Sequence, residues 1–399
     1  MDHYRRELLI RSSGALAAAA GAAAGWPVTA MSADKRTEPD VHIELRAQAG
    51  QVSIRPGMST RVWRYNGRLL RGEPAALETS VGGYLGPIIR VRRGQRVRID
   101  LLNNLPESTI IHWHGLHVPE AMDGHPRFAI APGARYRYTF TVRNRAGSYW
   151  FHPHPHGRTG KQVYAGLAGL FIVGDDEEAA IGLPGGAQDI PLVIQDRNID
   201  NDNQFVYPGG TGRTAREPRG GMMGGGMMAR MMGVLGDQIL VNGGTRATRE
   251  IPRRPHRLRL LNAANTRTLK LAWSDGSALT VIGSDGGLLA KPVQRGYVML
   301  APAERVELWV DFGRLPAGGE VALSSLEFEG GASMGGMMGG GGALPDGAAF
   351  EVQRFKMDSS PAQPGTPPAS LTPIAPADPR LAINFARPKV FDLTMGMMV

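Results

Sequence analysis

The sequence predicts an all-β protein with two sandwich-like domains, and three observations support this prediction. Glycine and proline are frequent, at 54 and 29 of 399 residues, whereas aromatic residues make up 7%. This composition suits short strands and turns better than long helices. Apolar and polar residues alternate in several segments, as in strands with one buried face. Two segments also recur in the same order, which indicates a duplicated β unit.

The clearest alternation lies in residues 96–101 and 135–142. In the first segment Val97, Ile99 and Leu101 alternate with Arg or Asp, and in the second aromatic and apolar residues alternate with Arg or Thr. A period of two places each apolar set on one face of a strand. Both segments are therefore predicted to be strands that bury this face in a core.

The repeat relates the two halves of the chain. Its two pairs are RRGQRVRIDLLNN (92–104) with RRPHRLRLLNAAN (253–265), and PGARYRYTFTV (132–142) with PAERVELWVDF (302–312). Because the order is kept, we predict one sandwich domain at residues 40–180 and a second at 185–355.

The N-terminus predicts an export signal at residues 1–30. Arg5 and Arg6 precede the Ala-rich run Gly14–Gly25, and small residues lead to Ala30. This order of basic, apolar and small residues is that of a signal peptide, and paired arginines favour the twin-arginine export machinery. An ordinary Ala-rich helix is the alternative. The sequence thus predicts a periplasmic protein with no membrane span.

Charge and cysteine content exclude several classes of protein. The formal charge is +9, but no basic block is interleaved with aromatic residues, so no nucleic-acid partner is predicted. The chain contains no cysteine, which rules out disulfides, thiolate metal ligands and a thiol nucleophile.

Three segments have biased composition. Residues 220–233 and 334–342 are Met–Gly tracts, and the segment that follows the second domain is rich in proline. We expect a Pro-rich linker at 356–385 and, at 386–399, the first strand of a truncated third domain.

Four histidines predict a metal site. His112 and His114 lie in IHWHGLHV, and His152 and His154 lie in FHPHPHG, 40 residues later. Residues i and i+2 of a strand face the same side, so neighbouring strands would bring four imidazoles together. Proline cannot donate to a sheet ladder, so the prolines between these histidines predict a strand end or a sheet edge.

Copper is the predicted metal. Imidazole ligands suit copper, zinc, iron or nickel, and thioether sulfur selects Cu(I), so the Met–Gly tracts decide for copper and are predicted to bind Cu(I). A disordered tract is the alternative. A dinuclear zinc hydrolase box would need Asp where this chain has Leu116, so that class is disfavoured.

The motifs HWHGLHVPEAMDG and WFHPHPHGRTGKQVYAGLAGLFIV resemble the first-domain copper motifs of multicopper oxidases. The resemblance is strongest to bacterial periplasmic copper-efflux oxidases and laccases, and covers most of residues 50–355. It implies tandem cupredoxin-like Greek-key β-sandwich domains. By this resemblance His112 would bind a type 2 copper, and His114, His152 and His154 the type 3 pair, while Asp123 would relay protons. The second domain would hold no metal.

The chain departs from the family pattern in its third domain. It has neither His-x-x-His-x-His nor His-Cys-His, so it would hold half of a trinuclear ligand set and no type 1 site. We expect the intact enzyme to oxidise Cu(I), phenols or metal ions with reduction of O2 to water, and the 399 residues alone to be inactive. The alternative is a non-enzymatic periplasmic protein for copper binding or tolerance. A scaffold that has lost catalysis would have no use for the four histidines.

Overall fold

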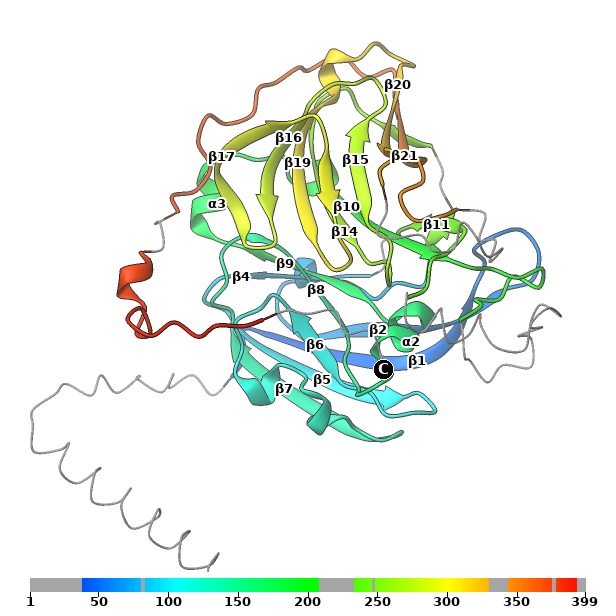
Figure 1. Cartoon of the computed structure of the whole chain (residues 1–399), viewed down its shortest axis with the longest axis vertical. Helices are drawn as coiled ribbons and strands as arrows, with labels where there is room; N and C mark the ends of the chain where they lie inside the picture. The colour runs from blue at the N-terminus through cyan, green and yellow to red at the C-terminus, as the bar shows by residue number, and fades with distance from the viewer. Residues whose placement is uncertain are drawn as a thin grey trace, which may run out of the picture. The chain divides into compact units, whose positions relative to one another are not determined.

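The structure is a computed structural model that describes residues 38–79, 83–207, 233–245, 248–329, 344–374 and 378–392. The described residues from Pro39 onward belong to one compact unit (Figure 1). The predicted signal peptide, the Met–Gly tracts apart from Gly233, and residues 393–399 lie outside the described residues.

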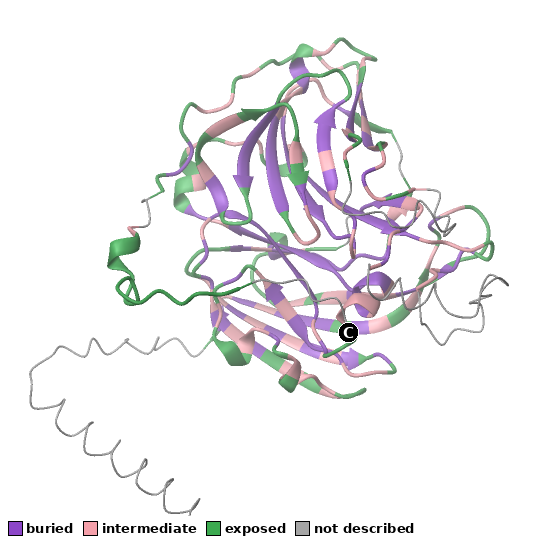
Figure 2. Cartoon of the chain, viewed as in Figure 1, coloured by how far each residue is buried: buried purple, intermediate pink, exposed green. Residues whose placement is uncertain are grey.

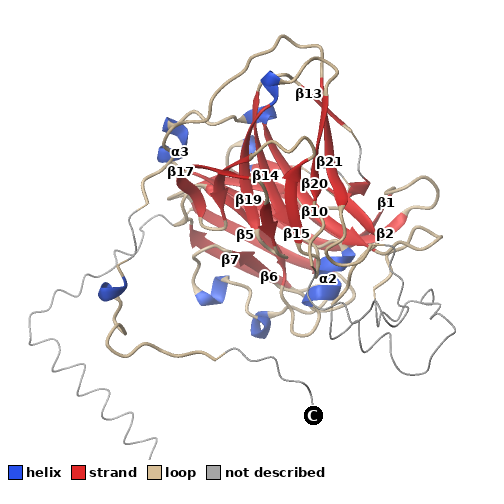
Figure 3. Cartoon of the chain, turned by 45° about the horizontal axis from the view of Figure 1, so that its top comes forward, coloured by secondary structure: helices blue, strands red, loops and turns tan. Residues whose placement is uncertain are grey.

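The protein is all-β, as predicted, and its strands form two sandwiches of cupredoxin type (Figure 3). The first sheet of the first sandwich has the order β2 (Thr60–Arg71), β1 (Val41–Val52), β5 (Arg96–Asn104), β7 (Arg135–Thr141). Its second sheet has the order β3 (Leu77–Glu78), β4 (Ile88–Arg92), β9 (Gly169–Gly174), β8 (Gly147–Pro153), β6 (Ile111–His114).

The alternation predicted for β5 and β7 is confirmed. Val97, Ile99 and Leu101 are fully buried in β5, whereas Arg98 and Asp100 between them are partly exposed. The core of the first sandwich fills the space between its two sheets, with Trp113 and Phe151 from the second sheet (Figure 2). Burial of these apolar side chains is the main stabilising term for such a domain.

The second sandwich packs a seven-stranded sheet on a five-stranded one. The larger sheet has the order β12 (Gly244–Thr245), β11 (Gln238–Val241), β10 (Asp189–Arg197), β14 (Pro255–Asn262), β19 (Arg305–Asp311), β16 (Leu279–Ser284), β17 (Gly287–Arg295). The smaller sheet has the order β13 (Arg249–Ile251), β21 (Phe350–Met357), β20 (Glu320–Ser325), β15 (Leu269–Trp273), β18 (Val298–Leu300).

The repeated segments occupy equivalent places in the two sandwiches. β5 pairs parallel with β1 and antiparallel with β7, and β14 pairs parallel with β10 and antiparallel with β19. The Asn of each Leu-Leu-Asn sequence also makes equivalent hydrogen bonds. Asn103 Nδ2 donates to the carbonyls of Glu107 and Ile130, and Asn262 Nδ2 donates to those of Arg267 and Leu300. These shared contacts explain why both halves have the same Leu-Leu-Asn sequence.

Short helices are the elements that strand periodicity did not predict. They are α2 (Thr159–Ala165) and α3 (Asp176–Ala180), with 3-10 turns at Pro74–Ala76, Glu120–Met122, Pro126–Phe128, Gly186–Gln188, Phe312–Arg314 and Pro379–Leu381. α2 ends at Gly166, whose φ is 124°. A Cβ there would lie 2.5 Å from the Trp63 carbonyl oxygen, so only glycine fits this close approach.

Between β21 and the 3-10 turn at Pro379–Leu381, the described residues of the segment predicted as a Pro-rich linker form no helix or strand. Part of this segment is nevertheless bound to the second sandwich. The Leu371 and Thr372 amides donate to the carbonyls of Ala290 and Leu289, and Leu371 packs against Ile282 and Trp309. Residues 386–392 of the predicted final strand form no strand.

The two sandwiches share a mixed interface. Its apolar part includes Trp150 and Leu170 of the first sandwich with Leu240 and Leu261 of the second. Its polar part is a buried ion network, defined here as Ser148, Glu178, Asp189, Arg257, Arg259 and Glu307. Among the described residues, no helix has the length and apolar character that crossing a bilayer requires.

Candidate metal centre

The pairing of β6 with β8 places the predicted histidines on one face of the second sheet. His112 lies directly opposite His152, and His114 lies opposite Trp150. The prediction from the prolines is confirmed, because β8 ends at Pro153 and β6 is the edge strand of its sheet. Beyond that end, the His154 amide donates to the Ile110 carbonyl at 2.9 Å, which keeps His154 next to β6.

The opposite face of these strands explains why the histidines point away from the core. Ile111, Trp113 and Phe151 alternate with the histidines and are fully buried between the sheets. A register shift of one residue would exchange the two faces and bury imidazoles among aromatic rings. The apolar set therefore fixes the direction of the imidazoles.

The four side chains, called here the histidine cluster (His112, His114, His152 and His154), lie close together. One ring nitrogen from each of His112, His114 and His152 lies within 4.8 Å of the others. His154 joins them through its ring, whose centroid is 5.4 Å from that of His112 and 6.1 Å from that of His152. The cluster thus offers convergent nitrogens from both strands.

Hydrogen bonds at Nδ1 leave Nε2 unprotonated on two of these imidazoles. His112 Nδ1 lies 2.8 Å from the Asp123 carbonyl oxygen, and His152 Nδ1 lies 2.9 Å from the Pro153 carbonyl oxygen. A carbonyl can only accept, so each Nδ1 carries the proton and each Nε2 presents a lone pair. Such partners orient the imidazoles that bind metal ions in proteins.

The environment favours neutral imidazoles. Burial, with a smaller contribution from the Arg305 charge, lowers the pKa of His114 to about 4. Burial likewise lowers the pKa of His152 to about 3 and, with the His112 charge, lowers the pKa of His154. Neutral rings are the form that binds a metal ion.

The donor atoms fit a bound cation. His154 Nδ1 is buried without a hydrogen-bond partner, and His114 Nδ1 faces His152 Nε2 at 3.3 Å. A buried polar atom without a partner is costly, and a metal ion between these rings would satisfy it. An all-imidazole set without thiolate suits copper among the metals that imidazole binds.

Asp123 lies beside the cluster and not within it. Its Oδ1 is 3.1 Å from His112 Nδ1, on the side of the ring that faces away from Nε2, and its side chain is 43% exposed. The carboxylate can therefore reach both solvent and the ring that it orients.

Gly124 sets this position, and its replacement gives a clear prediction. Its φ is 78°, and a Cβ would lie 2.0 Å from the Ile111 carbonyl oxygen. Gly133 has a φ of 79° and open space around it. We expect Gly133→Ala to cost about 1–2 kcal/mol from backbone strain alone. Gly124→Ala should cost more than about 3 kcal/mol, because the clash adds to the strain. Equal losses in urea unfolding of the two variants would contradict this.

None of the remaining described histidines takes part in the ring contacts of the cluster. His117 and His156 are exposed, and His125 caps the turn at Pro126–Phe128 by accepting from the Arg127 amide. His256 is buried in the second sandwich, where Nδ1 faces the Arg254 carbonyl. Leu116, at the position where a dinuclear zinc site needs Asp, is buried in the first core.

Comparison with known proteins agrees with this geometry. A family model described as multicopper oxidase matches residues 68–178, which include the whole histidine cluster. The solved structure of the McoA multicopper oxidase from Aquifex aeolicus is 32% identical, with a TM-score of 0.70 over 86% of this chain and 68% of McoA. The chain belongs to the multicopper oxidase family.

Curated relatives within this family carry two kinds of name. The multicopper oxidase mco of Staphylococcus aureus is 33% identical over 271 residues, covering 68% of this chain and 53% of that protein. The cell division protein FtsP of Escherichia coli is 34% identical over 313 residues, covering 78% of this chain and 58% of FtsP. The chain therefore spans little more than half the length of these relatives. Membership of the family implies copper as the metal.

Arg305 supports the cluster and was missed by sequence reasoning. From β19 in the second sandwich, its Nε donates to the Ser148 carbonyl of β8 at 3.1 Å, and it pairs with Asp285 at 2.6 Å. A Cβ at Gly115, next to His114, would lie 2.8 Å from Arg305 Nη2. One buried guanidinium thus contacts both histidine segments. Its only sequence signal is the repeat, which places it at the start of a strand.

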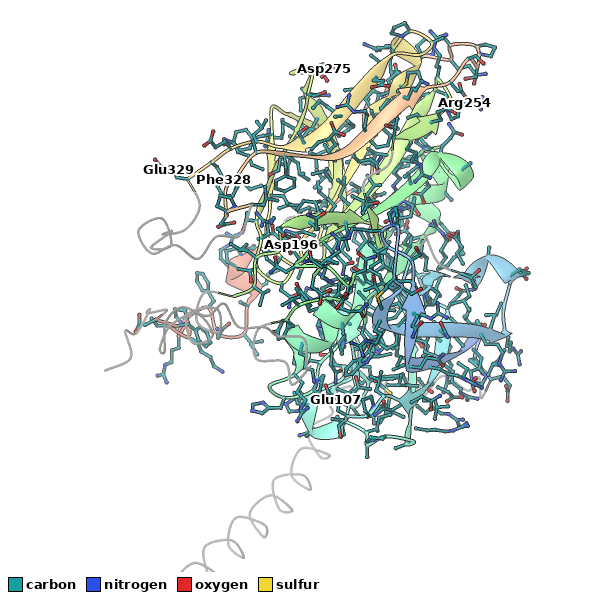
Figure 4. All side chains as sticks on the ribbon, turned by 90° about the vertical axis from the view of Figure 1, so that its right-hand side faces the viewer. Glu107, Asp196, Arg254, Asp275, Phe328 and Glu329 are labelled. Atoms are coloured by element: carbon teal, nitrogen blue, oxygen red, sulfur yellow. The ribbon has the colours of Figure 1, made fainter. Side chains whose placement is uncertain are left out.

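Glu107 is a second residue that the sequence did not reveal. Glu107 is labelled in Figure 4. It accepts from Arg158 Nη1 at 2.7 Å, Lys161 Nζ at 2.8 Å and Gln162 Nε2 at 3.0 Å. Thr109 Oγ1 also donates to Gln162 Oε1 at 2.8 Å. These bonds hold the start of α2 against the segment before β6, so the chain on both sides of the cluster is fixed.

Proposed function

We propose that this chain binds copper through the histidine cluster and belongs to an oxidase that couples oxidation of Cu(I), phenols or metal ions to reduction of O2 to water. The observation that carries the proposal is the convergence of His112, His114 and His152 nitrogens within 4.8 Å. His112 would bind the type 2 copper, and His114, His152 and His154 the type 3 pair.

The copper ions would supply electron transfer to oxygen. The residues of this chain would hold the ions and transfer protons. His112 and His152 hold their Nε2 lone pairs toward the centre through the hydrogen bonds of Nδ1. Asp123 would accept and release protons at Oδ1 between solvent and the His112 side of the cluster. Its partial exposure and its 3.1 Å distance to His112 support this role.

Four imidazoles are half of the ligand set that such a centre needs. The 399 residues contain no cysteine, so this polypeptide has no His-Cys-His segment and no type 1 site. We propose that turnover requires ligands from further polypeptide, and that the 399 residues alone bind copper without four-electron oxygen chemistry.

The proposal extends to location and copper supply. The twin-arginine pattern at Arg5 and Arg6 supports export to the periplasm by the twin-arginine machinery. Thioether sulfur prefers Cu(I), which supports a role for the Met–Gly tracts in binding that ion.

A non-enzymatic role is the second candidate, and the FtsP relatives favour it. Those relatives are named for cell division, and E. coli FtsP is as similar to this chain as the named oxidase is. In this case the chain would bind or sequester copper, and the histidine cluster would serve retention of the metal only.

Copper binding and oxidase turnover of the purified 399-residue chain separate these possibilities. We expect retained copper after desalting, no blue absorption, and no O2 consumption with Cu(I) or a phenol. Addition of a polypeptide that carries His-x-x-His-x-His and His-Cys-His segments should give O2 consumption if the enzyme proposal holds. Copper retention without O2 consumption after this addition would favour the non-enzymatic role. Failure to retain copper would contradict both the oxidase and the non-enzymatic proposal.

A further inference from the structure

A second concave site lies apart from the histidine cluster. It is a solvent-open cleft of about 520 Å³ between β1, β2, α2 and the segment at Phe205–Tyr207. This volume falls within the range of small-molecule sites in proteins. The residues that line it are Ala49, Gly50, Gln51, Arg61, Val62, Trp63, Lys161, Tyr164, Ala165, Phe205 and Tyr207.

Aromatic rings form much of the wall. The buried Tyr164 ring lies 5.0 Å from Tyr207 in a tilted contact and 6.0 Å from Phe205 in an edge-to-face contact, measured between ring centroids. Trp63 on β2 is partly exposed, and so are Phe205 and Tyr207. These three partly exposed rings line one hollow and offer stacking faces for a planar ligand.

The charged residues among the described lining of the cleft are both positive. Arg61 and Lys161 line it, and none of the described lining residues carries a carboxylate. Lys161 Nζ lies 5.5 Å from the Trp63 ring centroid, so charge and ring are adjacent. Lys161 also pairs with Glu107, but Arg158 pairs with the same carboxylate, and this group of three therefore keeps one net positive charge.

A further cation lies behind the rings. Arg197 is fully buried, and its guanidinium carbon is 4.6 Å from the Tyr164 ring centroid and 5.5 Å from that of Phe205. Its two Nη atoms donate to backbone carbonyls of Asp196 and Val163. Its charge adds positive potential to rings that line the cleft, which disfavours a cationic ligand and favours an electron-rich one.

We propose that this cleft binds a small planar aromatic anion, such as an aromatic carboxylate. The ring of the ligand would stack against the partly exposed rings of Trp63, Phe205 and Tyr207, and its carboxylate would face Lys161 Nζ and Arg61. Charge-assisted hydrogen bonds to the carboxylate supply affinity, and the rings select an aromatic body. Copper takes no part in this binding.

The test uses the full 399-residue chain, with chelator present, and calorimetric titration of 2-naphthoate. We expect one site with a dissociation constant below about 1 mM. The saturated decalin-2-carboxylate and the neutral 2-naphthalenemethanol should each bind at least about tenfold more weakly, since the first lacks the ring face and the second the charge.

The chain offers a matched pair of variants, because Lys161 and Arg158 both bind Glu107 and only Lys161 lines the cleft. We expect Lys161→Gln to weaken 2-naphthoate binding about tenfold and Arg158→Gln to change it less than about threefold. Arg61→Gln provides a second variant if melting shows that Lys161→Gln is unfolded. Equal effects of Lys161→Gln and Arg158→Gln, equal binding of the saturated acid, or no binding of 2-naphthoate would overturn the proposal.

Discussion

Replacing His114 and His152 together with alanine is expected to lower the affinity of the chain for Cu(II) by more than about 100-fold. Loss of a residue that merely orients a ligand costs 10–100-fold in many metal sites, and these two residues are proposed as direct ligands on adjacent strands. Cu(II) is the appropriate probe because thioethers bind it less well than Cu(I), which limits the contribution of the Met–Gly tracts.

The control removes the same number of histidines elsewhere. His42 faces Asp100 at 2.8 Å, and His117 is exposed, so His42→Ala with His117→Ala should leave Cu(II) affinity within about twofold of the original. Thermal melting of both double variants establishes that they are folded. Similar Cu(II) affinities for the two double variants would show that the histidine cluster is not the copper site.

Replacing Glu307 with glutamine is expected to lower the free energy of unfolding by about 3–5 kcal/mol. Glu307 is fully buried and accepts from Arg257 Nε at 2.8 Å, Arg259 Nη1 at 3.0 Å and Ser148 Oγ at 2.6 Å. The neutral side chain would leave two buried guanidiniums short of negative charge. Because Ser148 lies on β8, the loss should also loosen the contact between the sandwiches.

Glu320→Gln is the matched surface control. Glu320 is exposed and pairs with Arg354 at 3.2 Å, and exposed ion pairs contribute about 0–1 kcal/mol. Urea unfolding of both variants measures the difference. A loss below about 1 kcal/mol for Glu307→Gln would show that the buried ion network adds little to stability.

The same glutamate predicts how stability depends on pH. Burial alone would raise the pKa of Glu307, but the charges of Arg257 and Arg259 outweigh it and hold the pKa at about 2, below the ordinary value of 4.5. Its contribution is therefore fully present above about pH 4.5 and is lost as the pH falls toward 2. We expect the stability gap between the original chain and Glu307→Gln to close over this range. A gap that stays constant from pH 6 to pH 2 would contradict this.

The sequence could predict the strands and the shared direction of the histidines, because both follow from a period of two. Val97, Ile99 and Leu101 show this in β5, and the alternation of His112 and His114 with Trp113 shows it in β6. The prolines after His152 and His154 correctly indicated the end of β8. These patterns are local in the sequence. The geometry of a β-strand alone converts them into buried faces and strand ends.

Contacts between the sandwiches could not be predicted in this way. Arg305 meets Ser148 across 157 positions of sequence, and no local pattern specifies which arginine on a strand turns toward the other sandwich. α2 was missed because it has only seven residues, too few for a helical period to stand out. The aromatic cleft was missed because its residues are far apart in the sequence. Trp63, Lys161 and Tyr207 come together only in the folded chain.

Pulsed EPR of the chain loaded with one equivalent of Cu(II) tests most directly whether the histidine cluster is a copper site. If His112, His114, His152 and His154 hold the ion, the spectrum will show coupling to the remote nitrogens of more than one imidazole. That coupling will disappear in the His114 and His152 double variant and persist in the His42 and His117 variant. A spectrum without imidazole coupling, or one that the cluster variant leaves unchanged, would contradict a copper centre at these four residues.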